Sequence, residues 1–146
     1  GRFSKSFGIA QMRLDTATET LKWLKGKDEK ELSVGSPQAF LDLPEGERNS
    51  ALATLLHSSP TFSIGLAAAH LAMNREAIMS NTSAYPEPLS GEEVNYLLLI
   101  SYNYRDVLNW AGEAQGFSEL NQRIMGSETA MDYWNRAGYI YYNLMR

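Results

Sequence analysis

The sequence predicts an all-α fold. Apolar residues recur at three- and four-residue steps over most of the 146 residues, which is the spacing of one face of a helix. Serine followed by proline, or by glutamate three residues later, precedes several of these segments, and both patterns are typical of helix starts. No stretch of four or more residues shows a convincing strict alternation of apolar and polar side chains, so we expect no significant sheet.

The first helix is expected to begin at Leu14, where apolar residues start to recur at helical spacing. Asp15 or Thr16 is the expected N-cap, because either side chain can accept a hydrogen bond from a free backbone N–H. Gly26 is a usual residue at a helix end. The residues 28–35 are then expected to form an exposed loop.

Two short helices are expected next. Ser36 provides an N-cap, and Pro37 fits the first helical position, where its missing N–H costs nothing. Pro44 stops this helix, and the helical spacing of apolar residues resumes over 45–57.

A long helix over 61–80 is expected after a second Ser-Pro pair at 59–60. Its glycine and its alanines are small on several faces, which would let neighbouring helices approach closely. We therefore expect this Ala-rich helix to be the central and most buried element, packed between helices over 14–25 and 92–102.

A proline-containing loop over 81–89 leads to Ser90 and Glu93, which have the spacing of a capping box. The helix that they begin is strongly apolar and is expected to run to Tyr102. The aromatic residues of the last helix occupy more than one face, and one face is expected to pack in the core. The remaining tyrosines either line a groove or have no role. The set consists of Tyr133, Trp134, Tyr139, Tyr141 and Tyr142. Three further helical segments are expected, one through 110–114, one over 120–125 and one that begins at 127–128.

The composition excludes several classes of function. A net charge of −4 without a basic stripe gives no reason to expect nucleic acid as a partner. The absence of cysteine excludes disulfides, thiol catalysis and thiolate zinc sites, and no apolar run reaches the roughly 20 residues of a membrane span. His57 and His70 have no spacing that indicates a metal site, and there is no phosphate-binding or esterase motif. We therefore expect no metal and no cofactor.

The most informative stretch is 4–17, where a loop of small residues is expected to run directly into the first helix. It contains the pattern Ser-x-Gly-Ile-x-Gln-Met-x-x-x-Thr-Ala, with its serine at Ser6, its glycine at Gly8 and its glutamine at Gln11. Glycine lets a backbone come close to a bound group, and a side-chain amide offers both donors and an acceptor. Such a wall suits a ligand rich in hydroxyls and amides, as sugar polymers are.

This pattern resembles the serine-glycine-glutamine motif of the lysozyme-like superfamily, in particular the lytic transglycosylases and goose-type lysozymes that cut peptidoglycan. A second matching element is a helix that ends in a Tyr-Asn pair, here Tyr102 and Asn103. The Ala-rich helix matches the central helix of that fold. The resemblance implies a single lysozyme-like helical domain over 1–146.

The resemblance also implies an activity, that of a muramidase or lytic transglycosylase acting on the β-1,4 bond between N-acetylmuramic acid and N-acetylglucosamine. Ser6 and Gly8 would shape the loop beside the catalytic acid, and Gln11 would lie with Tyr102 in one groove. Asn103 would either contact the sugar or only end its helix. The implied partner is a peptidoglycan glycan strand, and a periplasmic or secreted location follows from that substrate. Hydrolysis by water and internal attack that gives an anhydro sugar both remain open.

One departure from the family concerns its catalytic glutamate, which lies ahead of the motif. No acidic residue precedes Asp15 in this sequence. We therefore expect the general acid in a segment upstream of Gly1, so that 1–146 is the later part of a longer protein. The alternative is a module that keeps the cleft and binds or supports peptidoglycan without cutting it. A third interpretation, an unrelated helical interaction domain, would make the motif coincidental.

Overall fold

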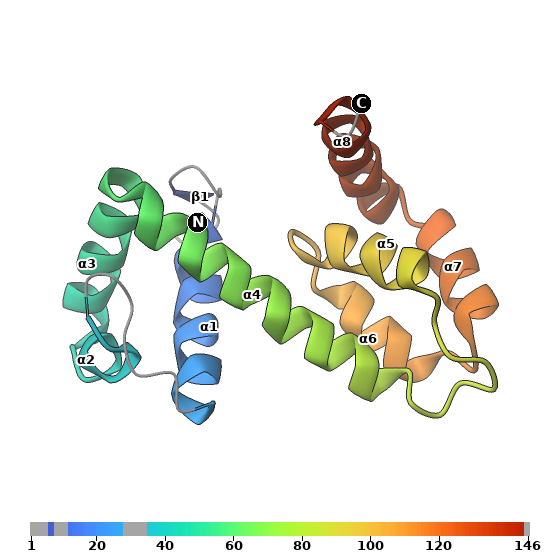
Figure 1. The fold of residues 1–146 in the computed structure, drawn as a ribbon, viewed down its shortest axis with the longest axis horizontal. Coiled ribbons are helices and arrows are strands. Elements are labelled where there is room, and N and C mark those ends of the chain that lie inside the picture. The colour runs from blue at the N-terminus through green and yellow to red at the C-terminus, as the bar shows by residue number, and fades with distance from the viewer. Residues whose placement is uncertain (1–5, 8–11, 28–34, 145–146) are drawn as a thin grey trace. The chain divides into compact units, whose positions relative to one another are not determined.

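The computed structural model describes residues 6–7, 12–27 and 35–144, with side chains described over 12–27 and 35–136. Within these ranges the fold is all-α, as predicted, with eight helices and one pair of two-residue strands (Figure 1). No helix in this described part of the chain is both long enough and apolar enough to span a membrane.

The contacts divide the chain into two compact units, residues 1–73 and 74–146, where the sequence led us to expect one domain. Each unit has a hydrophobic cluster of its own. The boundary falls inside the helix α4 (Pro60–Asn81), so no loop, linker or change of composition marks it in the sequence.

The first unit begins with a short antiparallel strand pair, β1 (Ser6–Phe7) and β2 (Met12–Arg13). Ser6 lies opposite Arg13, and Phe7 lies opposite Met12. The prediction of a loop running straight into the first helix therefore missed a strand pair. Two residues per strand are fewer than the four to eight over which an alternating pattern predicts a strand.

Three helices follow in the first unit, α1 (Leu14–Gly26), α2 (Pro37–Leu41) and α3 (Glu45–Ser58), and they lie side by side (Figure 1). Together with the first part of α4 they bury one cluster, in which the rings of Phe40 and Phe62 have centroids 5.7 Å apart. The buried residues of this cluster are Met12, Leu14, Ala17, Leu21, Leu24, Phe40, Leu52, Leu56, Phe62 and Leu66.

The predicted N-cap residues of the first unit agree with the structure at two of three helices. Ser36 Oγ accepts a hydrogen bond from the Ala39 N–H (3.3 Å), and Ser59 Oγ accepts one from the Phe62 N–H (3.2 Å). The predicted cap of α1 is wrong, because Arg13 occupies the N-cap position and its side chain makes no capping bond. The helix begins at Leu14 itself, so the two candidate caps are already inside its first turn.

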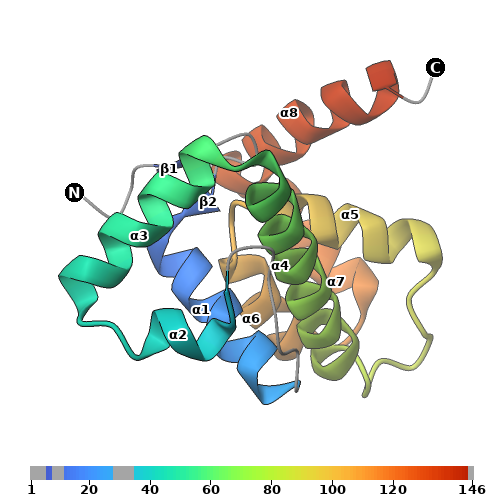
Figure 2. The ribbon, with the colours of Figure 1, turned by 60° about the vertical axis from the view of Figure 1, so that its left-hand side comes forward.

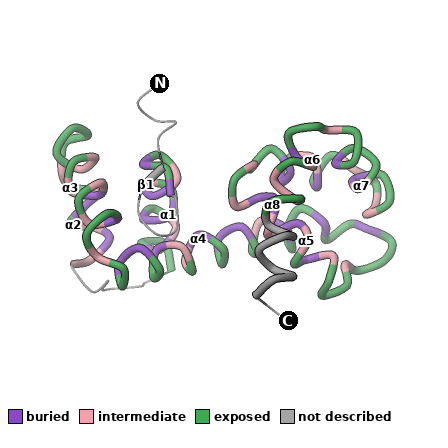
Figure 3. Tube along the Cα trace, turned by 90° about the horizontal axis from the view of Figure 1, so that it is seen from above, coloured by how far each residue is buried: buried purple, intermediate pink, exposed green. Residues whose placement is uncertain are grey.

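The prediction that the Ala-rich helix is the most buried element is also wrong. Buried and exposed stretches alternate along α4 (Figure 3). His70 is fully buried, whereas Ile64 is 58% exposed, Leu71 37% and Met79 46%. Small residues on several faces permit close neighbours but do not require a neighbour on every face.

The second unit contains the end of α4 and four more helices, of which α5, α6 and α7 pack in succession and α8 packs against α5 and α7 (Figure 2). The capping box at the start of α5 is confirmed, and α7 begins three residues earlier than predicted. The helices are α5 (Gly91–Ser101), α6 (Asp106–Glu113), α7 (Phe117–Met125) and α8 (Glu128–Leu144). The buried cluster consists of Ile78, Leu97, Ile100, Val107, Leu108, Ala111, Leu120, Ile124 and Ala130.

Two polar side chains hold the end of α4 and the loop after it against α6. Asn81 Nδ2 donates to the Leu108 carbonyl (2.8 Å), and the Tyr85 hydroxyl donates to the Ala111 carbonyl (2.6 Å). A Cβ at Gly112 would lie 3.7 Å from the side chain of Asn81, so the two elements approach closely at this glycine. The end of α4 and the first part of the loop after it are thus tied to α6.

Candidate functional site

Three of the predicted site residues belong to the motif ahead of α1. Ser6 lies in β1, opposite Arg13 of β2. Gly8 and Gln11 lie outside the described residues, so the wall that they were predicted to form stays a prediction, as does the common groove of Gln11 and Tyr102. The described part of the motif consists of the strand pair and the first residues of α1, which include the Thr16 and Ala17 of the motif.

Tyr102 and Asn103 lie together at the end of α5. The Tyr102 N–H donates to the Leu98 carbonyl (3.1 Å), and the Asn103 N–H donates to the Ile100 carbonyl (3.3 Å). The Tyr102 side chain is half-buried, and burial raises the pKa of its hydroxyl. A neutral phenol at this place can donate a hydrogen bond to a bound group. Asn103 is exposed on the turn, which agrees with the role of ending the helix.

A buried polar pair fixes the backbone just before Tyr102. Asn74 of α4 and Ser101 of α5 are both fully buried. Asn74 Nδ2 donates to the carbonyl oxygen and to the Oγ of Ser101, each at 3.3 Å. Buried polar groups are normally paired in this way, because an unpaired one costs about 1–3 kcal/mol. The helix end that carries Tyr102 is therefore held by a specific contact.

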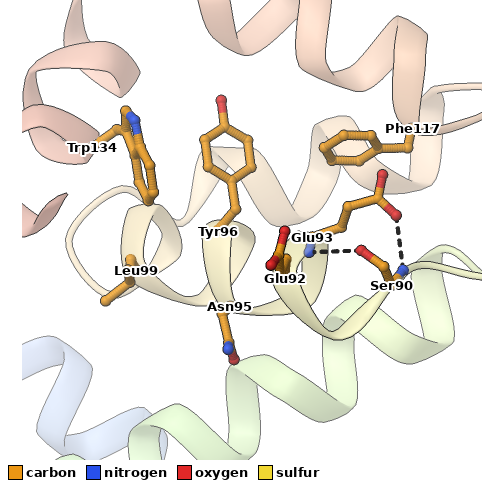
Figure 4. A pocket seen from close by; sticks show the side chains of 8 residues that line it. All are labelled: Ser90, Glu92, Glu93, Asn95, Tyr96, Leu99, Phe117 and Trp134. Carbon is orange, nitrogen blue, oxygen red and sulfur yellow. Dashed lines mark hydrogen bonds between the residues drawn. The ribbon is translucent and has the colours of Figure 1, made fainter. Parts of the chain in front are cut away.

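The second unit also contains a groove that the sequence analysis did not predict, with a volume of about 770 Å³. The rings of Trp134, Tyr96 and Phe117 stand in a row along it, and we call it the aromatic groove (Figure 4). The Tyr96 ring is in the middle, with its centroid 4.7 Å from that of Trp134 and 6.2 Å from that of Phe117, both edge to face. The other lining residues are Ser90, Glu92, Glu93, Asn95 and Leu99.

Hydrogen bonds position the polar groups of the aromatic groove. The Tyr96 hydroxyl donates to Asn121 Oδ1 (2.9 Å), and burial raises the pKa of this hydroxyl. At the other end, Ser90 Oγ accepts from the Glu93 N–H (3.1 Å), while Glu93 Oε1 accepts from the Ser90 N–H (2.8 Å), as the dashed lines in Figure 4 show. The groove is therefore built on a capped helix with its central ring tied to α7.

A second hollow adjoins the aromatic groove and shares Glu93 and Phe117 with it. Its volume is also about 770 Å³. Glutamate and amide side chains line much of its surface, with two prolines of the loop before α5. The residues that belong to this hollow alone are Pro86, Glu87, Pro88, Gln115, Gly116, Ser118, Glu119, Asn121 and Gln122.

The carboxylates that the structure describes lie at the surface. Each aspartate or glutamate among the described side chains is exposed except Glu93, which is half-buried and serves as part of the cap. A glycosidase needs a carboxylic acid that stays protonated near neutral pH, and apolar burial is the usual means of keeping it so. Glu93 is therefore the one carboxylate among the described side chains that is not exposed.

Comparison with protein-family models, with curated proteins and with solved structures finds no match for this chain. Over the residues that the structure describes, no group of three or more His, Cys, Asp or Glu side chains could hold a metal ion. The function must therefore be argued from the motif and from the two hollows.

No residue of the aromatic groove had been predicted as a groove residue from the sequence, since that interpretation concerned tyrosines of the last helix and not Trp134. Tyr96 and Phe117 were assigned no role, and Glu93 was identified only as a cap. One signal was present, since Tyr96 follows Glu93 by three residues and so lies on the same helix face. The position of Phe117 beside Tyr96 could not be predicted, because Phe117 belongs to α7 and no pattern within one helix shows that α7 packs beside α5.

Proposed function

We propose that this chain is part of a peptidoglycan-cleaving glycosidase, a muramidase or lytic transglycosylase. It would hold the glycan strand beside the β-1,4 bond between N-acetylmuramic acid and N-acetylglucosamine. The observation that carries the proposal is the motif of Ser6, Gly8 and Gln11 directly ahead of α1. Such a substrate would place the protein in the periplasm or outside the cell.

Tyr102 supports the proposal through its chemistry. Burial raises the pKa of its half-buried phenol above the ordinary value, and the residue follows the last residue of a capped helix. A neutral hydroxyl on a fixed helix end can hold a sugar oxygen or orient a carboxyl group. In this proposal Gln11 and Tyr102 are positioning residues, and the proton comes from elsewhere.

The general acid of the proposed reaction is a glutamate ahead of the motif, as in the families that the motif resembles. It would give its proton to the leaving oxygen of the glycosidic bond. The surface positions of the described carboxylates other than Glu93 support this placement, because apolar burial is the usual means of building such an acid.

The second candidate is a module that binds peptidoglycan without cutting it. The same surface positions favour this candidate, and so does the aromatic groove, since aromatic rings and amides are common in sugar-binding sites. The two candidates share the glycan partner and differ only in whether a proton donor acts beside it.

A turbidity assay on purified cell walls tests the proposal. It compares the polypeptide Gly1–Arg146 with a longer polypeptide that includes the segment encoded ahead of Gly1. We expect clearing by the longer polypeptide only, since a general acid contributes about 10²–10⁴-fold. Clearing by the shorter polypeptide would contradict the placement of the acid, and Asp15 and Glu19 would then be examined first.

Two variants of the longer polypeptide probe the site. Tyr102→Phe is expected to slow clearing, whereas Tyr133→Phe, which removes a hydroxyl from a ring stacked on that of Tyr104, is the matched control. If neither polypeptide clears the walls but both bind them, the binding module is the correct candidate. If neither binds, the proposed function is wrong in both forms.

A further inference from the structure

The two adjoining hollows of the second unit are acidic. Glu92 and Glu93 line the aromatic groove, and Glu87 and Glu119 line the second hollow. No lysine, arginine or histidine is among the described residues that line either hollow. A ligand in this groove therefore meets carboxylates without competing cations.

The charge of the whole chain is concentrated in the same unit. Residues 74–146 contain nine acidic residues against five arginines and no lysine, which gives a formal charge of −4. Residues 1–73 contain eight acidic and eight basic residues, so their formal charge is zero and the second unit carries the net −4 of the chain. A cation approaching the groove is attracted by the field of the unit as well as by the lining carboxylates.

The aromatic rings add the second element of cation recognition. Guanidinium and ammonium groups bind over the faces of Trp, Tyr and Phe rings, and the planar guanidinium also pairs with carboxylates through parallel hydrogen bonds. The row of Trp134, Tyr96 and Phe117 ends near Glu93, so rings and carboxylates lie within one groove (Figure 4).

The second unit already holds one of its own arginines in this manner. The guanidinium carbon of Arg123 lies 4.6 Å from the centroid of the Trp110 ring, and its Nη1 pairs with Glu113 Oε2. A ring and a carboxylate thus suffice to hold a guanidinium at the surface of this unit. The aromatic groove offers the same two groups without an arginine among its described lining residues.

We propose that the aromatic groove and the adjoining hollow bind an extended, arginine- or lysine-rich peptide segment of a partner protein. Two hollows joined at Glu93 and Phe117 suit a chain rather than a single small amine, because one cationic side chain can enter each hollow. The first would meet Trp134 and Glu92, and the second would meet Glu87 and Glu119. This site goes beyond the proposed glycosidase function and does not depend on it.

The test is a fluorescence anisotropy titration of the polypeptide Gly1–Arg146 with a labelled peptide that contains six arginines separated by glycines. The matched probe replaces every arginine by citrulline, which keeps the shape and removes the charge. We expect the citrulline peptide to bind at least tenfold more weakly. We also expect the arginine peptide to bind more weakly as salt rises from 0.05 to 0.5 M, because salt screens attraction between exposed charges.

Paired variants locate the site. The double variant Glu87→Gln with Glu92→Gln should weaken binding of the arginine peptide by about tenfold. The control double variant, Glu76→Gln with Glu128→Gln, removes the same charge from exposed positions of the second unit outside both hollows. The control pair is expected to change the affinity less than about twofold.

Three results would overturn the inference. Equal binding of the arginine and citrulline peptides would show that the groove does not recognise the positive charge of the side chains. Equal weakening by both variant pairs would show attraction to the unit as a whole rather than to the groove. The third result is that the protein binds a neutral oligomer of N-acetylglucosamine but not the arginine peptide. If Trp134→Ala abolished that binding, the groove would be a sugar site instead.

Discussion

The hydrogen bond between the Tyr85 hydroxyl and the Ala111 carbonyl is expected to be a main tie of the second unit. Tyr85 is only 8% exposed, and the two oxygen atoms are 2.6 Å apart. Helix α6 ends at Glu113, and the Gln115 N–H, which would otherwise lie within reach of the Ala111 carbonyl, donates to Glu119 Oε2 (3.0 Å). The Ala111 carbonyl therefore relies on the tyrosine.

Tyr85→Phe removes this donor without changing the ring. Because Ala111 is fully buried, its carbonyl would lose a partner that water cannot easily replace. We expect the free energy of unfolding to fall by about 1–3 kcal/mol, the usual cost of an unsatisfied buried polar group. The matched control Tyr133→Phe should change it by less than about 0.5 kcal/mol, since the Tyr133 ring stacks on Tyr104 and its stack is preserved.

The assay is urea unfolding followed by tryptophan fluorescence in a Trp23→Phe background. The two remaining tryptophans, Trp110 and Trp134, both belong to the second unit, so the signal reports that unit. Equal stabilities of Tyr85→Phe and Tyr133→Phe would refute the argument. In that case the Ala111 carbonyl would have another partner, and the loop before α5 would be held by packing alone.

Three further predictions use the same assay. Ser90→Ala breaks the capping box of α5 and should cost about 1 kcal/mol; a change below about 0.3 kcal/mol would mean that the cap contributes nothing. Leu120→Ala, at a fully buried position, should cost about 3 kcal/mol, whereas Met125→Ala at a 62% exposed position should cost less than about 0.5. Burial raises the pKa of Tyr96 and Tyr102, so their contribution to stability is fully present below about pH 10 and is lost as pH rises through their folded-state pKa. Stability that stayed constant from pH 9 to pH 12 would contradict those shifts.

Local features of this fold could be predicted from the sequence. The serine caps at Ser36 and Ser59 and the capping box at Ser90 lie where the sequence places them, because each depends on residues within three positions of one another. The cap of α1 was misplaced because Asp15 has the chemistry of a cap but lies one residue inside the helix. The starts of α1 and α3 have no capping side chain and were predicted from the spacing of apolar residues instead.

Features that depend on packing between elements could not be predicted. The exposed face of α4 carries Ile64 and Leu71, which are as apolar as the residues it buries, so composition does not tell the two faces apart. The aromatic groove unites residues of α5, α7 and α8 whose sequence positions differ by up to 44, from Ser90 to Trp134. No periodicity within one helix could reveal such a site. The motif residues Gly8 and Gln11 were found from the sequence alone, and their geometry stays a prediction.

The central claim is that the motif ahead of α1 binds peptidoglycan, and co-sedimentation of the polypeptide Gly1–Arg146 with purified peptidoglycan tests it most directly. The measurement is made in 0.5 M salt, which suppresses attraction through the acidic groove. We expect binding that falls about fivefold or more in Gln11→Ala, the usual effect of losing one or two hydrogen bonds to a ligand. Gln38→Ala, which removes the same amide from a side chain bonded to Asp42, should leave the bound fraction unchanged. Absence of binding, or equal binding by both variants, would contradict the account.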